Sequence, residues 1–149
     1  MAQFGTRSKS NMIGLHPDLI RVLNRAILAF DFTILEGVRS DHQCFINWGK
    51  GRTVEQCRKA GIPNPERYAQ PRLTKVTWLR DPLGSNHRAK ADGLGHAVDC
   101  LPYPIDWNDI DRFKNLAAHM LNAARIENVK IIWGGDWKEK DYPHFELAE

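Results

Sequence analysis

The chain has 149 residues, of which 42% are apolar, and carries a net charge of +3 with a sequence pI near 8.8. This length and composition exclude a disordered chain and predict one domain over residues 1–149, with about residues 1–12 loosely held because they are polar. The positive charge is mild and scattered, which favours an acidic partner and argues against nucleic acid. Because no apolar run suits a membrane span or a signal peptide, we expect no stable membrane insertion.

The three cysteines, Cys44, Cys57 and Cys100, are odd in number and form no C-x-x-C pair. This pattern argues against a disulfide framework and against a thiolate zinc site. Cys44 and Cys100 lie in apolar segments, so we expect them to be buried thiols.

The first third of the chain predicts two helices with a strand between them. Apolar residues at helical spacing, with a proline in the first turn, predict a core helix over residues 17–30. Alternation predicts a strand over residues 32–38. Ser40 and Gln43 resemble a capping box, which predicts a helix that ends near Gly49.

Residues 50–84 are rich in proline and have weak periodicity, so we expect a long ordered excursion that forms a functional wall. The remaining elements do not follow a regular βαβ alternation, which predicts an α+β fold with a small antiparallel sheet flanked by helices. These elements are a strand over 97–101, a helix over 107–125, a strand over 129–133, a Gly134-Gly135 turn and a strand over 144–147.

Three segments carry side chains of the kinds that bind metals, at or beside predicted strands. A catalytic zinc ion takes three protein ligands and leaves a fourth place for water. His87, Asp99 and His144 would meet that requirement. The segments are Ser85-Asn86-His87, Gly95-His96-Ala97-Val98-Asp99 and Asp141-Tyr142-Pro143-His144.

The first histidine ligand has two candidates. His96 is nearest to Asp99 in sequence, but a separation of three on a strand places the two side chains on opposite faces. His87 lies further back, in a segment able to fold over the strand, and we prefer it. His96 is the reserve ligand, or it lines the cleft and contacts substrate.

Two further residues suit a hydrolase. Asp141 lies three positions before His144, where its carboxylate would stand beside the metal and take a proton from water. Arg39 follows a predicted strand and would hold a carbonyl or carboxylate through its planar guanidinium. Each also has an ordinary interpretation, because Asp141 could open a turn, Arg39 could form a surface ion pair and Asp99 could be a buried, hydrogen-bonded aspartate.

Taken together, these motifs resemble the VanY-like zinc peptidases, which include D-Ala-D-Ala carboxypeptidases and the L-alanyl-D-glutamate endopeptidases found among phage endolysins. The resemblance runs in order from about residue 14 to residue 147. The motifs are Leu15-His16-Pro17-Asp18-Leu19, Glu36-Gly37-Val38-Arg39-Ser40, Ser85-x-His87, Gly95-x-Ala97-x-Asp99, Trp133-Gly134-Gly135-Asp136-Trp137 and Asp141-x-Pro143-His144-Phe145.

The resemblance implies the small α+β fold shared with the hedgehog signalling domain and a zinc ion held by His87, Asp99 and His144. It further implies that Asp141 is the catalytic acid and base and that Arg39 acts at the substrate. We also expect Ser85 and His96 to contact the substrate. The chain departs from the family pattern in one place, because His87 precedes Asp99 by twelve residues where seven are usual.

The expected activity is zinc-dependent peptidoglycan hydrolysis of the phage endolysin type, with cleavage of the L-alanyl-D-glutamate bond of the stem peptide. We expect a monomer that stays in the host cytoplasm and reaches the wall after the membrane is permeabilised. Two alternatives stay open: a D-Ala-D-Ala carboxypeptidase or dipeptidase with the same zinc site, and a zinc-containing binding module without catalysis.

Overall fold

The structure is a computed structural model that describes residues 2–148. These residues fall into two compact units, one made of the segments up to residue 38 and from residue 89 onward, the other of residues 39–88. Each unit is described by itself, and the prediction of a single domain over residues 1–149 stays a prediction. None of the described helices is long and apolar enough to cross a bilayer.

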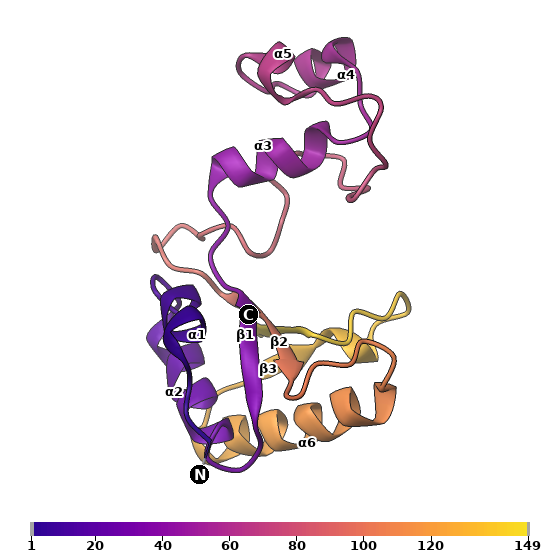
Figure 1. Cartoon of the computed structure of the whole chain (residues 1–149). Coiled ribbons are helices and arrows are strands. Elements are labelled where there is room, and N and C mark those ends of the chain that lie inside the picture. Colours follow the sequence, from indigo (N-terminus) through magenta and orange to yellow (C-terminus); the bar gives the residue numbers. More distant parts are fainter. Residues whose placement is uncertain (1, 149) are drawn as a thin grey trace. The chain divides into compact units, whose positions relative to one another are not determined.

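The first unit is built on a four-stranded sheet in which every neighbouring pair is antiparallel, in the order β1-β2-β4-β3. Figure 1 labels β1, β2 and β3 of this sheet. The predicted α+β fold with a small antiparallel sheet is therefore confirmed. The strands are β1 (Phe32–Glu36), β2 (Ala97–Pro102), β3 (Ile131–Trp133) and β4 (His144–Leu147).

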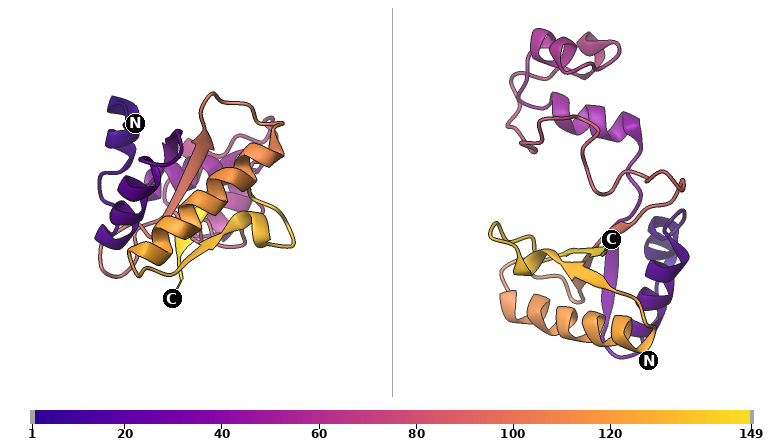
Figure 2. Two further views of the ribbon diagram at one scale, coloured as in Figure 1. Left: turned by 90° about the horizontal axis from the view of Figure 1, so that it is seen from below. Right: turned by 180° about the vertical axis from the view of Figure 1, so that it is seen from behind.

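Helices of the first unit pack on this sheet, and α6 lies along one of its faces (Figure 2). The predicted start of a helix just after His16 is confirmed. The Nδ1 atom of His16 accepts a hydrogen bond of 3.0 Å from the Asp18 backbone N–H and so caps this helix. The helical elements are α1 (Thr6–Asn11), α2 (Pro17–Ala26), α6 (Ile110–Ile126) and the short 3₁₀ helix η1 (Gly134–Asp136).

The alternation of side chains along β2 and β4 divides the sheet into a core face and a second face. Val98, Cys100 and Phe145 are fully buried on the core face. They pack in one cluster with apolar residues of α2 and α6, which include Leu19 and Leu116. The helical periodicity seen in the sequence thus corresponds to the face that each helix turns toward the sheet.

The amino-terminal segment differs from the expectation of a loosely held stretch. It contains α1, and Phe4 and Met12 at its two ends are buried in the core. The Ser8 hydroxyl accepts a hydrogen bond of 3.0 Å from the Ile34 backbone N–H, which attaches α1 to β1. Two apolar residues in a polar segment are too few to show the recurrence of apolar residues that marks a helix, so the sequence did not predict α1.

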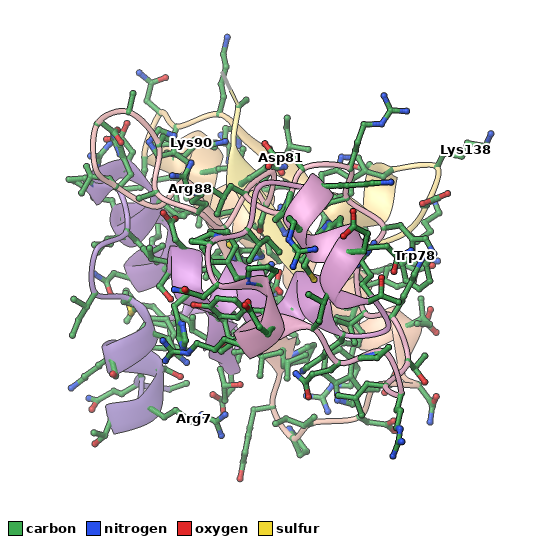
Figure 3. The ribbon with its side chains drawn as sticks, turned by 90° about the horizontal axis from the view of Figure 1, so that it is seen from above. Arg7, Trp78, Asp81, Arg88, Lys90 and Lys138 are labelled. Atoms are coloured by element: carbon green, nitrogen blue, oxygen red, sulfur yellow. The ribbon has the colours of Figure 1, made fainter. Side chains whose placement is uncertain are left out.

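The second unit consists of short helices around a small apolar cluster, as expected of an ordered excursion. Arg52 is buried there, donates to the Trp48 carbonyl at 2.7 Å and to the Thr77 carbonyl at 2.9 Å, and lies over the Trp48 ring. Trp78, labelled in Figure 3, is 77% exposed. The helices are α3 (Asp41–Gly49), α4 (Val54–Lys59) and α5 (Pro65–Tyr68).

The core face of α6 provides a test of this packing. We expect Leu116→Ala to lower the free energy of unfolding by about 2–5 kcal/mol, because Leu116 is fully buried and the truncation leaves a cavity. Leu121→Ala on the same helix is the matched control, since Leu121 is 40% exposed and surface changes usually stay within about 0.5 kcal/mol. Urea unfolding measures both values, and equal losses would contradict the assigned core face.

Candidate active site and metal centre

Asp99 and His144 occupy directly opposite positions of β2 and β4. Opposite residues of an antiparallel pair project from the same face, with their Cβ atoms about 5 Å apart. The Asp99 Oδ1 atom lies 3.2 Å from the His144 Nδ1 atom. Because Val98 and Phe145 are the preceding pair and point into the core, Asp99 and His144 must lie on the opposite face of the sheet.

His144 is held by carboxylates on both of its ring nitrogens. Its Nε2 atom lies 2.8 Å from Glu146 Oε1, while Nδ1 faces Asp99. Glu146 follows two positions later on the same strand and therefore shares the face of His144. Our reading of the sequence missed Glu146, although the period of two residues along β4 was a signal that could have found it.

The surroundings of His144 change its proton affinity. Its ring is buried, with a relative exposure of 4%, and burial alone lowers the pKa of a histidine. The hydrogen bonds with Asp99 and Glu146 and the nearby charge of Asp141 outweigh that effect, so the pKa of His144 is raised above its ordinary value. A site that attracts a proton in this way also attracts a cation.

Asp141 is positioned by a close approach of the chain to Gly134. The Asp141 backbone N–H donates to the Gly134 carbonyl at 2.9 Å, and the His144 N–H donates to the Asp141 carbonyl at 3.2 Å. A Cβ atom on Gly134 would lie only 2.3 Å from the Asp141 carbonyl oxygen. The Asp141 Oδ2 atom lies 4.0 Å from His144 Nδ1, with the side chain 47% exposed, which places a half-exposed carboxylate beside the ring.

Aromatic rings complete this side of the site. The ring of Trp133 lies against Gly135, where a Cβ atom would come within 2.2 Å of it, and its Nε1–H donates to the Tyr142 carbonyl at 2.7 Å. The ring of Trp137 lies 5.0 Å from that of His144. The Trp-Gly-Gly motif of the sequence therefore corresponds to a tight turn that holds the segment preceding β4.

In the second unit, Arg39, Ser85 and His87 form a hydrogen-bonded group. The Ser85 hydroxyl accepts from the Arg39 guanidinium at 3.0 Å and from the His87 backbone N–H at 3.1 Å. The Arg39 backbone N–H in turn donates to the His87 carbonyl at 2.8 Å. His87 is buried, with a relative exposure of 5%. These contacts explain why serine stands two positions before the histidine in the Ser-x-His motif.

Asp99 and His144 of the first unit offer a carboxylate and an imidazole that could hold a metal ion, and the third predicted ligand, His87, belongs to the second unit. Imidazole and carboxylate groups are among the protein ligands of catalytic transition-metal sites. The structure places His96 in another group, with His16 and Asp92, rather than in the group of Asp99. The choice of His87 over the reserve ligand and the contact of His96 with substrate stay predictions.

Comparisons with known proteins each find peptidases. A family model described as D-alanyl-D-alanine carboxypeptidase matches residues 81–147. The L-alanyl-D-glutamate peptidase of Escherichia phage T5 is 27% identical over 150 residues, covering 97% of this chain and 88% of that protein. The crystal structure of the L-Ala D-Glu endopeptidase ChiX of Serratia marcescens matches with a TM-score of 0.64 and 28% identity, covering 98% of this chain and 90% of that one.

These findings confirm the resemblance to the VanY-like peptidases, and the chain is a metallopeptidase. The peptidases of the matched family are metal-dependent, and the pair of Asp99 and His144 supplies suitable donors. The metal-dependent class was thus predicted correctly from motifs that lie in separate parts of the sequence.

The raised pKa of His144 gives a first test of the site. In metal-free protein we expect His144 to titrate above the ordinary value of 6.5, and Asp99→Asn to lower that pKa. Protonated His144 then contributes stability that is fully present below its unfolded-state pKa and is lost as pH rises through the folded-state pKa. NMR titration of the ring with chelator present measures the pKa, and a value below 6.5 would contradict this account.

The bond between Glu146 and His144 gives a second test. We expect Glu146→Ala to weaken metal binding by about 10–100-fold, because carboxylates that orient a ligating histidine contribute that much. Glu146→Gln keeps a hydrogen-bond acceptor and should lose less. Glu139→Ala, an exposed change in the segment before β4, is the control. Metal competition with a chromogenic chelator measures affinity, and equal values for the alanine variants would remove Glu146 from the site.

Proposed function

We propose that the chain is a zinc-dependent peptidoglycan hydrolase that cuts the L-alanyl-D-glutamate bond of the stem peptide. The arrangement of Asp99 opposite His144, with Asp141 at 4.0 Å from the same ring, carries this proposal. The named activities of the phage T5 relative and of the Serratia structure support the choice of bond. The mild positive charge of the chain suits an acidic polymer as substrate.

Zinc would be held by His87, Asp99 and His144. The Nδ1 atom of His144 is the nitrogen directed toward Asp99, so it is the one we assign to the metal. The Nε2–H group then donates to Glu146, an arrangement that fixes the tautomer of a ligating histidine. A bound zinc ion supplies Lewis-acid chemistry, since it lowers the pKa of water and polarises a carbonyl group.

Asp141 would act as the general base and then the general acid. Its carboxylate is half-exposed, so water can reach it, and the turn on Gly134 restricts its position. It takes a proton from the attacking water and returns it to the leaving amine. Arg39, which Ser85 orients through a 3.0 Å hydrogen bond, would bind the developing negative charge or a carboxylate of the substrate.

A second candidate is a D-Ala-D-Ala carboxypeptidase or dipeptidase, which the description of the matching family model favours. It would use the same metal ligands and the same base. A binding module without catalysis fits less well, because a purely structural metal site does not require the half-exposed Asp141 beside its histidine. The substrate surface in either enzyme would include the second unit, whose residues 50–84 we expected to form a wall.

The place of action follows from the substrate. We propose that the enzyme acts as a monomer on the cell wall, which it reaches from the host cytoplasm once the membrane is breached. The stem peptide is the expected partner, and we expect binding to nucleic acid to play no part.

The role of Asp141 can be tested without disturbing the metal. We expect Asp141→Ala to bind zinc normally and to lose about 10²–10⁴-fold in wall hydrolysis, the usual contribution of a positioned acid or base. Glu139→Ala, in the same segment, should retain activity. The loss of turbidity of purified peptidoglycan measures hydrolysis, and metal analysis measures the bound zinc. Unchanged hydrolysis by Asp141→Ala would exclude it as the base.

The bond is identified by mass spectrometry of the released products. A muropeptide cut after L-alanine supports the endopeptidase, whereas loss of a terminal D-alanine would establish the second candidate instead. Intact substrate with protein that binds zinc tightly would indicate the binding module.

A further inference from the structure

A second group of metal-binding side chains lies in the first unit, apart from Asp99 and His144. His16, Asp92 and His96 each offer one ligand atom, and these atoms lie within 4.8 Å of one another. The rings of His16 and His96 meet edge to face, with their centres 5.2 Å apart. His96 Nε2 lies 2.8 Å from Asp92 Oδ2. None of these contacts is needed for the peptidase mechanism described above.

The backbone holds this group together before any ligand binds. The His16 N–H donates to the Gly95 carbonyl at 2.8 Å, and the Gly95 N–H donates to the Gly14 carbonyl at 2.9 Å. Asp92 lies in a tight turn in which its Oδ1 atom accepts from the Leu94 N–H at 2.9 Å. The extra residues between His87 and Asp99, which depart from the family spacing, therefore build the turn that brings Asp92 beside the two histidines.

The group is also open to solvent and to ions. The side chains of His16, Asp92 and His96 are 27%, 40% and 16% exposed, so water could fill the remaining coordination positions. His16 and His96 line a surface cavity of about 260 Å³ together with Asp18 and Lys130. The pKa of Asp92 is lowered by the hydrogen bond from the Leu94 N–H and then by His96, so its carboxylate is ionised at neutral pH.

The donor set selects a class of ion. Imidazole nitrogens suit zinc, copper, nickel and iron, whereas calcium and magnesium prefer sites made wholly of oxygen atoms. Two ligand atoms about 2.0 Å from a tetrahedral metal lie about 3.3 Å apart. The present separation of 2.8 Å between Asp92 and His96 therefore needs only a small adjustment, in which the metal replaces the shared proton.

We propose that His16, Asp92 and His96 form a second site for a divalent transition-metal ion, with Zn²⁺ as the probe. Binding requires a rearrangement at His16, because its Nδ1 atom now accepts the hydrogen bond that caps α2. A neutral ring in that state carries its proton on Nε2. The ion therefore replaces either the capping bond or the Nε2 proton, and it links the start of α2 to the turn that contains Asp92.

The experiment counts zinc by equilibrium dialysis at buffered free Zn²⁺, followed by atomic absorption. His144→Gln removes a ligand of the proposed catalytic centre and should still bind one ion. Adding Asp92→Asn, His96→Gln or His16→Asn to this variant should lower its affinity for that zinc ion by at least about tenfold, since even residues that only orient metal ligands contribute this much.

These substitutions are chosen so that the variants should fold. The amide oxygen introduced by Asp92→Asn can still accept from the Leu94 N–H, and the asparagine introduced by His16→Asn is a good cap for α2. His119→Gln, which replaces a histidine outside both groups, is the matched control and should leave zinc binding unchanged.

Two further readings follow the ion itself. Zn²⁺ should raise the melting temperature of His144→Gln and leave that of His144→Gln/His96→Gln unchanged, because a ligand that binds only folded protein stabilises it. The amide signal of Asp18 should shift with the ion, as its bond to His16 changes. The second site would be overturned if the His144→Gln protein binds no zinc. It would also be overturned if that protein keeps the same zinc affinity after each of the three further substitutions.

The outcomes also separate this site from the proposed function. If the wild-type chain binds one ion that His96→Gln removes and His144→Gln does not, the second site stands and the zinc centre of the peptidase fails. If His144→Gln alone removes the only ion, the second site fails and the peptidase centre stands.

Discussion

The antiparallel pairing of β2 with β4 is the constraint on which the site of the first unit depends. It places Val98 against Phe145 in the core and, one position along, Asp99 against His144 on the other face. A register shift by a single residue would turn the side chains of one strand to the other face and separate His144 from Asp99. The apolar pair therefore stabilises the register, and the register positions the two candidate ligands, so that packing and site geometry have the same physical origin.

The charges around His144 explain why this face is suited to a cation. Asp99 and Glu146 lie against its two ring nitrogens, and Asp141 lies nearby. Like charges grouped at a partly buried place repel one another unless a positive charge is present. A proton on the imidazole provides that charge in part, which is the cause of the raised pKa, and a divalent ion would provide more of it.

One stretch of chain carries Asp92 and His96 of the second group as well as Asp99, which pairs with His144. The segment that follows His87 contains Asp92 and His96 and then enters β2 at Ala97. His96 and Asp99 bracket the start of that strand and belong to different clusters because side chains alternate between faces.

The sequence by itself determined the class of fold, the helix predicted over residues 107–125 and found over residues 110–126, and the strands around Asp99 and His144. Periodicity and motif order carry this information because they are local. The roles of Arg39, Ser85, His87 and Asp141 stay predictions. Only the tertiary structure revealed helix α1, the bond from Glu146 to His144 and the association of His16 with Asp92 and His96. These three features depend on contacts between residues far apart in the chain, or on which face of a strand a side chain occupies. A short sequence pattern contains neither kind of information.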